Sequence, residues 1–373
     1  MIMGAGGSCT QIDTAVDRLM MPRLKRGPQD LFVQEHVAPR AISSASTEGS
    51  RLSIRVVIAT KGRPAAVGEL LHCLNQQSRL PDAIVVVGTC AADLPRLKAW
   101  SEVPFVSLVS SLPGLTVQRN LGVVHLRRHR PVDNGVIVFF DDDFRPHSGW
   151  LQQCEWAFEG HPSVVGVTGR VLADGIATQQ IEETTAAQLL AGVELPPHLI
   201  ETSPIGTLYG CNMAVRETMF GLHSFCEDLP NYGWLEDLDF SGQICRSGDL
   251  IKVTTCVGVH LGVVDARMDP RQLGYSQIAN PLWLRRRRTI SRLDCVRILV
   301  RRTLAPAVKS LGSERAQEYR GRLVGVAIAY LHLVQGRLHP MAITEMDDRS
   351  RVCRRTDDGA LAETSGEVVS PNR

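Results

Sequence analysis

The stretch VIVFFDDDFRPHSGWL, Val136–Leu151, places three consecutive aspartates directly after five apolar residues. The five residues have the length and composition of a buried strand. Like charges at neighbouring positions repel, and each carboxylate is more stable in water than in an apolar interior. A strand that ends abruptly on Asp141, Asp142 and Asp143 therefore indicates a polar feature at its carboxyl end.

Segments typical of strands and helices alternate around this stretch. Further apolar runs with the composition of strands are Arg55–Thr60, Ala83–Gly88, Phe105–Val109 and Val164–Gly169. Helices are expected after Pro64, between Gly114 and Leu126, and after Pro146. Apolar runs without alternation are typical of strands with both faces covered, so we predict an α/β fold with a Rossmann-like, mostly parallel sheet flanked by helices. Ligands bind at the carboxyl ends of the strands in such sheets, which is where the three aspartates lie.

Composition divides the chain into four expected regions. Residues 1–50 are rich in Gly, Ser, Pro and Ala and are expected to form a flexible tail. The α/β domain is expected at 51–280, an arginine-rich helical extension at 281–350, and a polar, disordered tail at 351–373. The glycines of MGAGGS follow no predicted strand, so we assign them to the first tail and not to a dinucleotide-binding loop.

The composition excludes some classes of protein. The chain has 41 Lys and Arg against 39 Asp and Glu, so we expect no nucleic-acid partner. None of the ten cysteines lies in a CxxC pair or at zinc-ligand spacing, which indicates free thiols in a reducing compartment. The longest apolar run, Leu323–Val334, is shorter than the roughly 20 residues of a spanning helix, and no secretory signal is evident. We expect a cytoplasmic protein, with peripheral association at the inner face of the membrane as an alternative.

A carboxylate cluster at a strand end has three common uses. It can bind a divalent cation, act in acid–base chemistry, or form a solvated turn before a helix. Hard cations prefer oxygen ligands, and Asp141 and Asp143 can hold one between them while Asp142 points elsewhere. A second acidic pair, Glu236 and Asp237 in YGWLEDLDF, is predicted at a helix start, where negative charge is favourable. Acidic pairs also begin helices without any further role, so neither motif alone defines a function.

Five segments, in chain order, resemble the family 2 nucleotide-sugar glycosyltransferases, which have the GT-A fold. The segments are VVIATKGRP, GLTVQRNLG, FFDDDFRPHSGWL, GCNMAVR and GWLEDLDFSGQICRSG. The resemblance covers about Ser53 to Trp283. It implies an inverting, metal-dependent transferase that moves a sugar from a nucleoside-diphosphate sugar to an acceptor hydroxyl in polysaccharide or glycoconjugate assembly.

The resemblance also implies roles for the acidic residues. A divalent cation, Mn²⁺ or Mg²⁺, would be held by Asp143 and by His260 in VGVHLG, and it would stabilise the diphosphate leaving group. A packed core histidine is the alternative for His260. Asp237 matches the general base that accepts the proton of the acceptor hydroxyl, and Glu236 matches the residue that orients the acceptor.

Other matching positions are implied to contact the nucleotide or the donor sugar. They are Thr60, Arg63, Arg119, Asn120, Asp141, Asp142, Gly210 and Asn212. Family members carry an aspartate that reads the base at the end of the second strand, but the corresponding stretch here, Val85–Cys90, has none. Asp93 is the nearest substitute, and a UDP-sugar is the default donor.

The most basic stretch is LRRRRTISR, which contains Arg285–Arg288. Such a run is usually a solvated helix face, but it can also contact acidic lipid or a lipid-linked acceptor at a membrane surface. The expected partners are therefore a nucleotide-sugar donor and a glycan or lipid-linked acceptor. The QxxRW signature of processive polysaccharide synthases is missing, which favours the transfer of one sugar per encounter.

Two other functions stay open on sequence grounds. A sugar-phosphate nucleotidyltransferase has a related sheet but needs a glycine-rich, basic loop after the first strand, and ATKGRP offers only a short version of one. A catalytically silent scaffold that binds nucleotide sugar would not need to retain both acidic motifs.

Overall fold

The computed structural model describes most of the chain between residues 33 and 344. The described residues are 33–36, 51–95, 103–129, 131–132, 134–176, 179–196, 201–263, 269–312 and 316–344. They all belong to one compact unit that begins at residue 32. The tail expected at 351–373 and the glycine-rich start of the chain lie outside the described residues.

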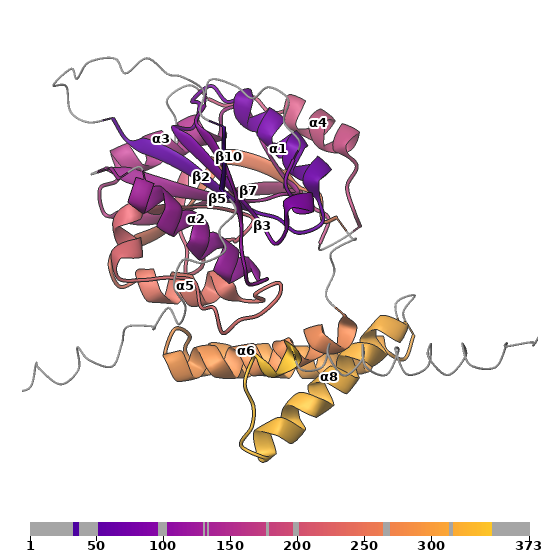
Figure 1. Cartoon of the computed structure of the whole chain (residues 1–373). Helices are drawn as coiled ribbons and strands as arrows, with labels where there is room; N and C mark the ends of the chain where they lie inside the picture. The colour runs from indigo at the N-terminus through magenta and orange to yellow at the C-terminus, as the bar shows by residue number, and fades with distance from the viewer. Residues whose placement is uncertain are drawn as a thin grey trace, which may run out of the picture. The chain divides into compact units, whose positions relative to one another are not determined.

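Among the described residues, a ten-stranded sheet forms the centre of the fold (Figure 1). Its strands are β1 (Val33–His36), β2 (Ser53–Ala59), β3 (Ala83–Gly88), β4 (Phe105–Val109), β5 (Gly135–Asp141), β6 (Phe144–Pro146), β7 (Val164–Asp174), β8 (Thr202–Pro204), β9 (Asn212–Arg216) and β10 (Asp249–His260). The order across the sheet is β1-β4-β3-β2-β5-β9-β7-β10-β6, and β8 pairs with β10. Strands β4, β3, β2, β5, β7 and β10 run in one direction, and the other four run against them. The predicted mostly parallel sheet of an α/β fold is confirmed.

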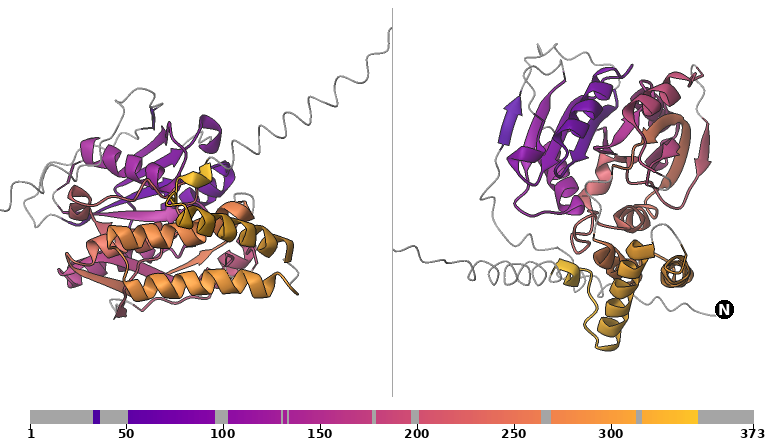
Figure 2. Two further views of the ribbon diagram at one scale, coloured as in Figure 1. Left: turned by 90° about the horizontal axis from the view of Figure 1, so that it is seen from below. Right: turned by 90° about the vertical axis from the view of Figure 1, so that its right-hand side faces the viewer.

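Helices cover both faces of this sheet (Figures 1 and 2). The helices of the described residues are α1 (Pro64–Asn75), α2 (Leu115–His129), α3 (Trp150–Gly160), α4 (Glu183–Ala191), α5 (Glu236–Ile244), α6 (Pro270–Arg287), α7 (Arg292–Lys309) and α8 (Ala316–Val334), with short 3-10 helices η1 (Ala91–Asp93) and η2 (Glu217–Gly221). Side chains of α1 and α3 form one core with the sheet, and side chains of α2 and α5 form a second core on the opposite face. Strand β2 contributes to both cores, because Val56 and Ile58 face the first and Val57 faces the second. Burial on both faces explains why these strands show no polar alternation.

The strands that run in one direction end at the same edge of the sheet. Asp141 is the last residue of β5, Asp174 of β7 and His260 of β10, and Thr60 directly follows β2. Strand β9 runs in the opposite direction, so its first residue, Asn212, lies at this edge too. The register of β7 and β10 pairs His260 with Asp174. One edge of the sheet thus gathers polar residues at the ends of buried strands, and the aspartate triplet lies at this edge, as predicted.

Three strands differ from the sequence-based expectations. Strand β7 continues beyond its predicted end at Gly169, because Arg170, Val171 and Asp174 also pair with β10. Arg170 is exposed and the next four residues are only partly buried, so the apolar pattern is interrupted after Gly169. The residues up to Pro146, where a helix was expected to begin, form β6 and pair with the end of β10; the helix begins at Trp150. Strand β1 lies within the segment expected to be a flexible tail and pairs with β4.

Helices α6, α7 and α8 follow β10, and we call them the helical extension. The predicted boundary at residue 281 lies within α6, and this division of the chain stays a prediction. Helices α6 and α8 approach closely, because Cβ atoms at Gly274 and Gly325 would each meet the backbone of the other helix. Arg287, one of the four arginines singled out in the sequence, forms an ion pair of 3.1 Å with the buried Asp239 of α5 and so attaches the extension to the α/β domain. No helix in the described part of the chain is long and apolar enough to cross a membrane.

The cysteines of the described residues are free thiols, as predicted. Five of these eight are buried, whereas Cys90 and Cys245 are exposed. Burial raises the pKa of Cys226 to about 11, so this thiol is unreactive at neutral pH.

Gly258 of β10 controls how closely β6 and β10 can approach. A Cβ atom at this position would lie 2.0 Å from the ring of Phe144. We therefore expect Gly258→Ala to displace Phe144, which directly follows Asp143, and to lower the free energy of unfolding by about 1–3 kcal/mol. Chemical denaturation followed by tryptophan fluorescence measures this change.

Gly68→Ala in α1 is the matched control. No atom lies within 4 Å of the Cβ position there, and alanine forms helices better than glycine, so this variant should be more stable by about 0.5–1 kcal/mol. Equal stability of Gly258→Ala and the unmodified protein would contradict the packing described for β6 and β10.

Candidate active site

Asp141, Asp143 and His260 form a cluster that can hold a metal ion. One donor atom from each side chain lies within 4.8 Å of the others. His260 Nε2 lies 3.3 Å from Asp143 Oδ1 and 3.9 Å from Asp141 Oδ2. Asp143 and His260 are buried and Asp141 is half-buried, so the cluster is partly open at Asp141. Two carboxylates and an imidazole are suitable ligands for a divalent cation.

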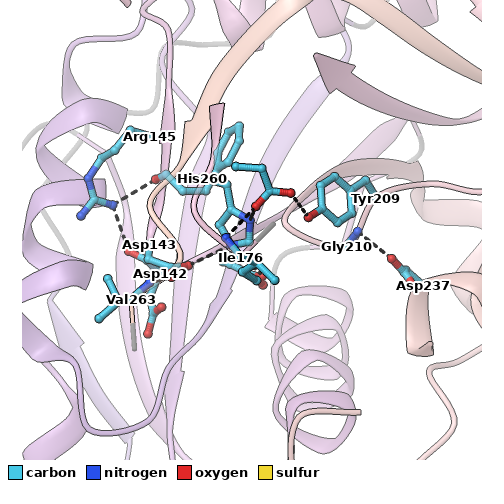
Figure 3. A network of polar contacts seen from close by, with 12 residues as sticks. Asp142, Asp143, Arg145, Ile176, Tyr209, Gly210, Asp237, His260 and Val263 are labelled. Atoms are coloured by element: carbon cyan, nitrogen blue, oxygen red, sulfur yellow. Dashed lines mark hydrogen bonds and ion pairs between the residues drawn. The ribbon is translucent and has the colours of Figure 1, made fainter. Parts of the chain in front are cut away.

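The ring of His260 is held from its other side. His260 Nδ1 lies 3.2 Å from Asp174 Oδ1, and the Tyr209 hydroxyl donates to Asp174 Oδ2 at 2.7 Å (Figure 3). A carboxylate in this position keeps the proton on Nδ1 and directs Nε2 to the cluster. Carboxylates behind metal-ligating histidines have this role in many metal sites, so the residues present fit a cation.

The carboxylates favour positive charge at this position. Burial alone would lower the pKa of His260, but its hydrogen bonds with Asp143 and Asp174 raise that pKa well above the usual value. Burial alone would raise the pKa of Asp143, but the hydrogen bond from His260 lowers it below the usual carboxyl range. The strand ends thus stabilise a cation between them, which is the electrostatic requirement for a metal site.

Asp142 points away from the cluster, as predicted. Its side chain is fully buried, and its Oδ2 accepts a hydrogen bond from Thr60 Oγ1 at 2.7 Å. Arg63 lies 2.7 Å from Asp142 Oδ1 and 3.1 Å from Asp143 Oδ2. Burial outweighs this ion pair and raises the pKa of Asp142 to about 7. Thr60, Arg63 and Asp142 thus anchor the aspartate triplet, and contact of these residues with a nucleotide stays a prediction.

Arg119 connects the cluster to the second acidic motif. Its buried guanidinium lies 2.9 Å from Asp141 Oδ1, forms an ion pair with Glu236 Oε1, and donates to Gly210 O at 2.8 Å. The guanidinium also lies over the ring of Phe139, at 5.7 Å from its centroid. Burial alone would lower the pKa of Arg119, but the surrounding carboxylates raise it, so this side chain is charged. One cation therefore joins the two acidic motifs at a single site.

The acidic pair begins helix α5, as predicted. Leu235, directly before it, has a left-handed backbone with φ of 73°, which leucine rarely adopts and which turns the chain into the helix. Asp237 Oδ2 accepts a hydrogen bond from Gly210 N at 3.1 Å, and Oδ1 accepts one from Leu238 N at 2.8 Å. Burial raises the pKa of both carboxyl groups. Glu236 is buried, whereas Asp237 is half-buried.

The loop before β9 contacts both parts of the site (Figure 3). The Tyr209 hydroxyl donates to Asp174, and the next residue, Gly210, donates its N–H to Asp237. A Cβ atom at Gly210 would lie 2.7 Å from Glu236 Oε1, so a larger residue would displace the acidic pair. The close approach of this backbone explains why the position is glycine.

Asn120 and Asn212 make contacts within the protein. Asn120 exchanges two hydrogen bonds of 3.0 Å with the backbone of Phe225, in the loop before α5. Asn212 is buried inside the sheet, where its Oδ1 accepts from Thr168 Oγ1 at 2.7 Å and from Gly169 N at 3.0 Å. Contact of either asparagine with the donor stays a prediction.

Asp93 joins the loops that follow β2 and β3. Its Oδ1 accepts from Gly62 N, and its Oδ2 accepts from Thr89 N and Oγ1, each at 2.7 Å. Burial alone would raise its pKa, but these hydrogen bonds lower it. Its proposed substitution for the base-reading aspartate stays a prediction.

Three features of the site are not evident from the sequence. The aspartate triplet is identified in the sequence because it directly follows an apolar run. Asp174 also ends a strand, but the apolar pattern of β7 stops at Gly169, five residues earlier, so the sequence does not mark Asp174 as a strand end. Tyr209 belongs to no recognisable motif, because its partner lies 35 residues away in the chain. Arg119 bridges Asp141 and Glu236, which lie in distant segments of the chain, and the spacing of residues in the sequence does not indicate that these three side chains meet.

No protein-family model matches the sequence, and no curated protein matches it. Similar solved structures include TarS from S. aureus, with a TM-score of 0.43 and 15% identity over 72% of this chain and 47% of that chain. GalNAc-T7, in a structure with UDP, GalNAc and Mn²⁺, has a TM-score of 0.43 and 13% identity over 60% of this chain and 46% of that chain. The mannosyltransferase PcManGT from Pyrobaculum calidifontis, in complex with GDP-Man and Mn²⁺, has a TM-score of 0.41 and 14% identity over 76% and 88% of the two chains.

These three neighbours are GT-A-type glycosyltransferases. This chain spans less than half the length of the TarS and GalNAc-T7 chains.

Asp174→Asn tests the carboxylate behind His260. The amide keeps the size of the side chain but loses the charge that orients the imidazole, so Mn²⁺ should bind about 10–100-fold more weakly. Isothermal titration calorimetry with Mn²⁺ measures this affinity without any turnover.

Asp249→Asn is the matched control, because Asp249 is an exposed aspartate at the opposite end of β10. This variant should bind Mn²⁺ like the unmodified protein. Equal affinities of Asp174→Asn, Asp249→Asn and the unmodified protein would contradict the role assigned to Asp174.

Proposed function

We propose that this protein is an inverting, metal-dependent glycosyltransferase of the GT-A type, related to family 2. The proposed reaction transfers a sugar from a nucleoside-diphosphate sugar to an acceptor hydroxyl. The observation that carries the proposal is the bridge through Arg119, whose guanidinium contacts both Asp141 of the cation cluster and Glu236 beside Asp237. Such a bridge holds the cation cluster, which can bind the diphosphate of the donor, close to Asp237, which can accept the proton of the acceptor hydroxyl.

Cleavage of the bond between the anomeric carbon and the diphosphate leaves negative charge on the diphosphate. A divalent cation held by Asp141, Asp143 and His260 would stabilise that charge. Arg63 reaches the same edge of the sheet, since its guanidinium contacts Asp143, and it is a second positive charge that a diphosphate can meet.

The acceptor hydroxyl loses its proton as its oxygen attacks the anomeric carbon. Asp237 is suited to accept this proton, because its carboxylate is half-buried, held by two backbone N–H groups, and raised in pKa by burial. Glu236, held by Arg119, is suited to orient the acceptor. One displacement of the diphosphate by the acceptor oxygen inverts the configuration at the anomeric carbon.

The proposed donor is a UDP-sugar, and the proposed acceptor is a glycan or lipid-linked glycan of polysaccharide or glycoconjugate assembly. Support for this choice comes from the sequence resemblance. Thr60 and Arg63, in the loop after β2, lie beside the cation cluster and support a nucleoside-diphosphate donor without selecting its base.

The products of the reaction distinguish this function from its alternatives. Incubation with Mn²⁺, a panel of nucleotide sugars and glycan acceptors should release a nucleoside diphosphate. Release of pyrophosphate would instead indicate a nucleotidyltransferase. Tight donor binding without any product would indicate a catalytically silent scaffold.

Asp237→Asn removes the proposed proton acceptor while keeping the shape of the side chain. We expect donor affinity to change little and kcat to fall by about 10²–10⁴-fold, because only the proton transfer is lost. Calorimetric donor binding and turnover, measured on one preparation, separate the two effects. Asp249→Asn again serves as the control, and undiminished turnover by Asp237→Asn would refute the assigned base.

The raised pKa of Asp237 sets the expected dependence on pH. The base must be ionised to accept a proton, so kcat/KM should fall as the pH drops through the pKa of Asp237 in the free protein. Burial raises that pKa above its usual 3.8, so the decline should begin at a higher pH than for an exposed aspartate. The profile is measured with Mn²⁺ in excess from about pH 4 to about pH 8. A constant kcat/KM over this range would contradict the assignment.

A further inference from the structure

Helix α7 exposes an apolar face to solvent. Its exposed aliphatic side chains are Leu293 (58%), Val296 (54%), Val300 (52%), Leu304 (58%) and Val308 (70%). Successive members are three or four residues apart, so these five side chains, the α7 stripe, lie along one face of the helix. Single exposed aliphatic residues are common on soluble proteins, but a continuous stripe of them marks an interaction surface.

The opposite face of α7 is the one that packs against the protein. Cys295 and Pro306 are buried, and Leu299 packs against a cluster that includes Leu284 of α6. Arg302 lies over the ring of Trp234, 5.1 Å from its centroid. The α7 stripe therefore points away from the contacts that hold this helix, and it is not needed to attach the helix to the domain.

Basic side chains flank the α7 stripe. The α7 sequence contains five basic residues and a single acidic one, Asp294. Exposed arginines on α7 and at the end of α6 just before it are Arg286, Arg288, Arg292, Arg297 and Arg301. Asp294 neutralises little of this charge, since its ion pair with Arg297 is 3.7 Å long and exposed.

We propose that the α7 stripe and its flanking arginines bind the surface of a bilayer that contains anionic phospholipid. A helix of this kind lies in the plane of the interface, where its aliphatic side chains enter the boundary of the acyl chains and its arginines contact lipid phosphates. A second copy of this chain is a poorer occupant, because the same arginines would face each other across the contact. The surface lies outside the candidate active site, so the inference does not depend on sugar transfer.

Flotation of the full chain with vesicles tests the proposal. The protein should float with vesicles of phosphatidylcholine and phosphatidylglycerol, and much less with vesicles of phosphatidylcholine alone. Val300→Glu combined with Leu304→Glu places two carboxylates on the stripe and should weaken partitioning by at least about tenfold. Arg297→Glu combined with Arg301→Glu leaves the stripe intact and should remove the preference for the anionic vesicles.

Leu222→Glu is the matched control, because Leu222 is an aliphatic residue with 87% exposure that lies just after η2. It should float like the unmodified protein, and Mn²⁺ binding should be unchanged in every variant, which shows that each is folded. Absence of flotation with the anionic vesicles, or equal flotation of the Val300→Glu/Leu304→Glu variant, would overturn the proposal. A dimer that becomes a monomer in this variant would also overturn it, because a second copy would then cover the stripe.

Discussion

The buried positive charge of Arg119 is the constraint on which the candidate site depends. A guanidinium removed from water is stable only when carboxylates and carbonyls surround it, and Asp141, Glu236 and the carbonyl of Gly210 supply them. These partners come from β5, α5 and the loop before β9, so one side chain fixes three segments that are distant in the sequence. The position of the acidic pair relative to the cation cluster follows from this bridge.

The direction of the strands explains why the aspartates follow a buried strand. Strands β5, β7 and β10 run in the same direction. Strands β5 and β10 end on Asp141 and His260 of the cation cluster, and β7 ends on Asp174, which holds His260. The three aspartates have different contacts. Asp142 contacts Thr60 and Arg63, whereas Asp141 and Asp143 face His260. Repulsion among the three is reduced by two arginines. Arg119 contacts Asp141, and Arg63 contacts both Asp142 and Asp143.

What the sequence predicts depends on how local the signal is. The apolar run before Asp141 and the helix start at Glu236 are local, so the strand, the sheet edge and the acidic helix start were all predictable. The insertion of β9 between β5 and β7 and the contact of Asp174 with His260 arise from strand pairing, which periodicity does not encode. The exposed face of α7 was not predictable either, because buried and exposed apolar faces repeat with the same helical spacing.

The central claim is that the aspartate triplet and the Glu236–Asp237 pair face one substrate site that binds a divalent cation. Crystals grown with Mn²⁺ and UDP, with diffraction data collected at the manganese absorption edge, locate the ion directly. We expect one anomalous peak between Asp141, Asp143 and His260, with the diphosphate beside it and Asp237 facing the same space. A peak at another position, or UDP bound on a surface remote from Asp237, would contradict the claim.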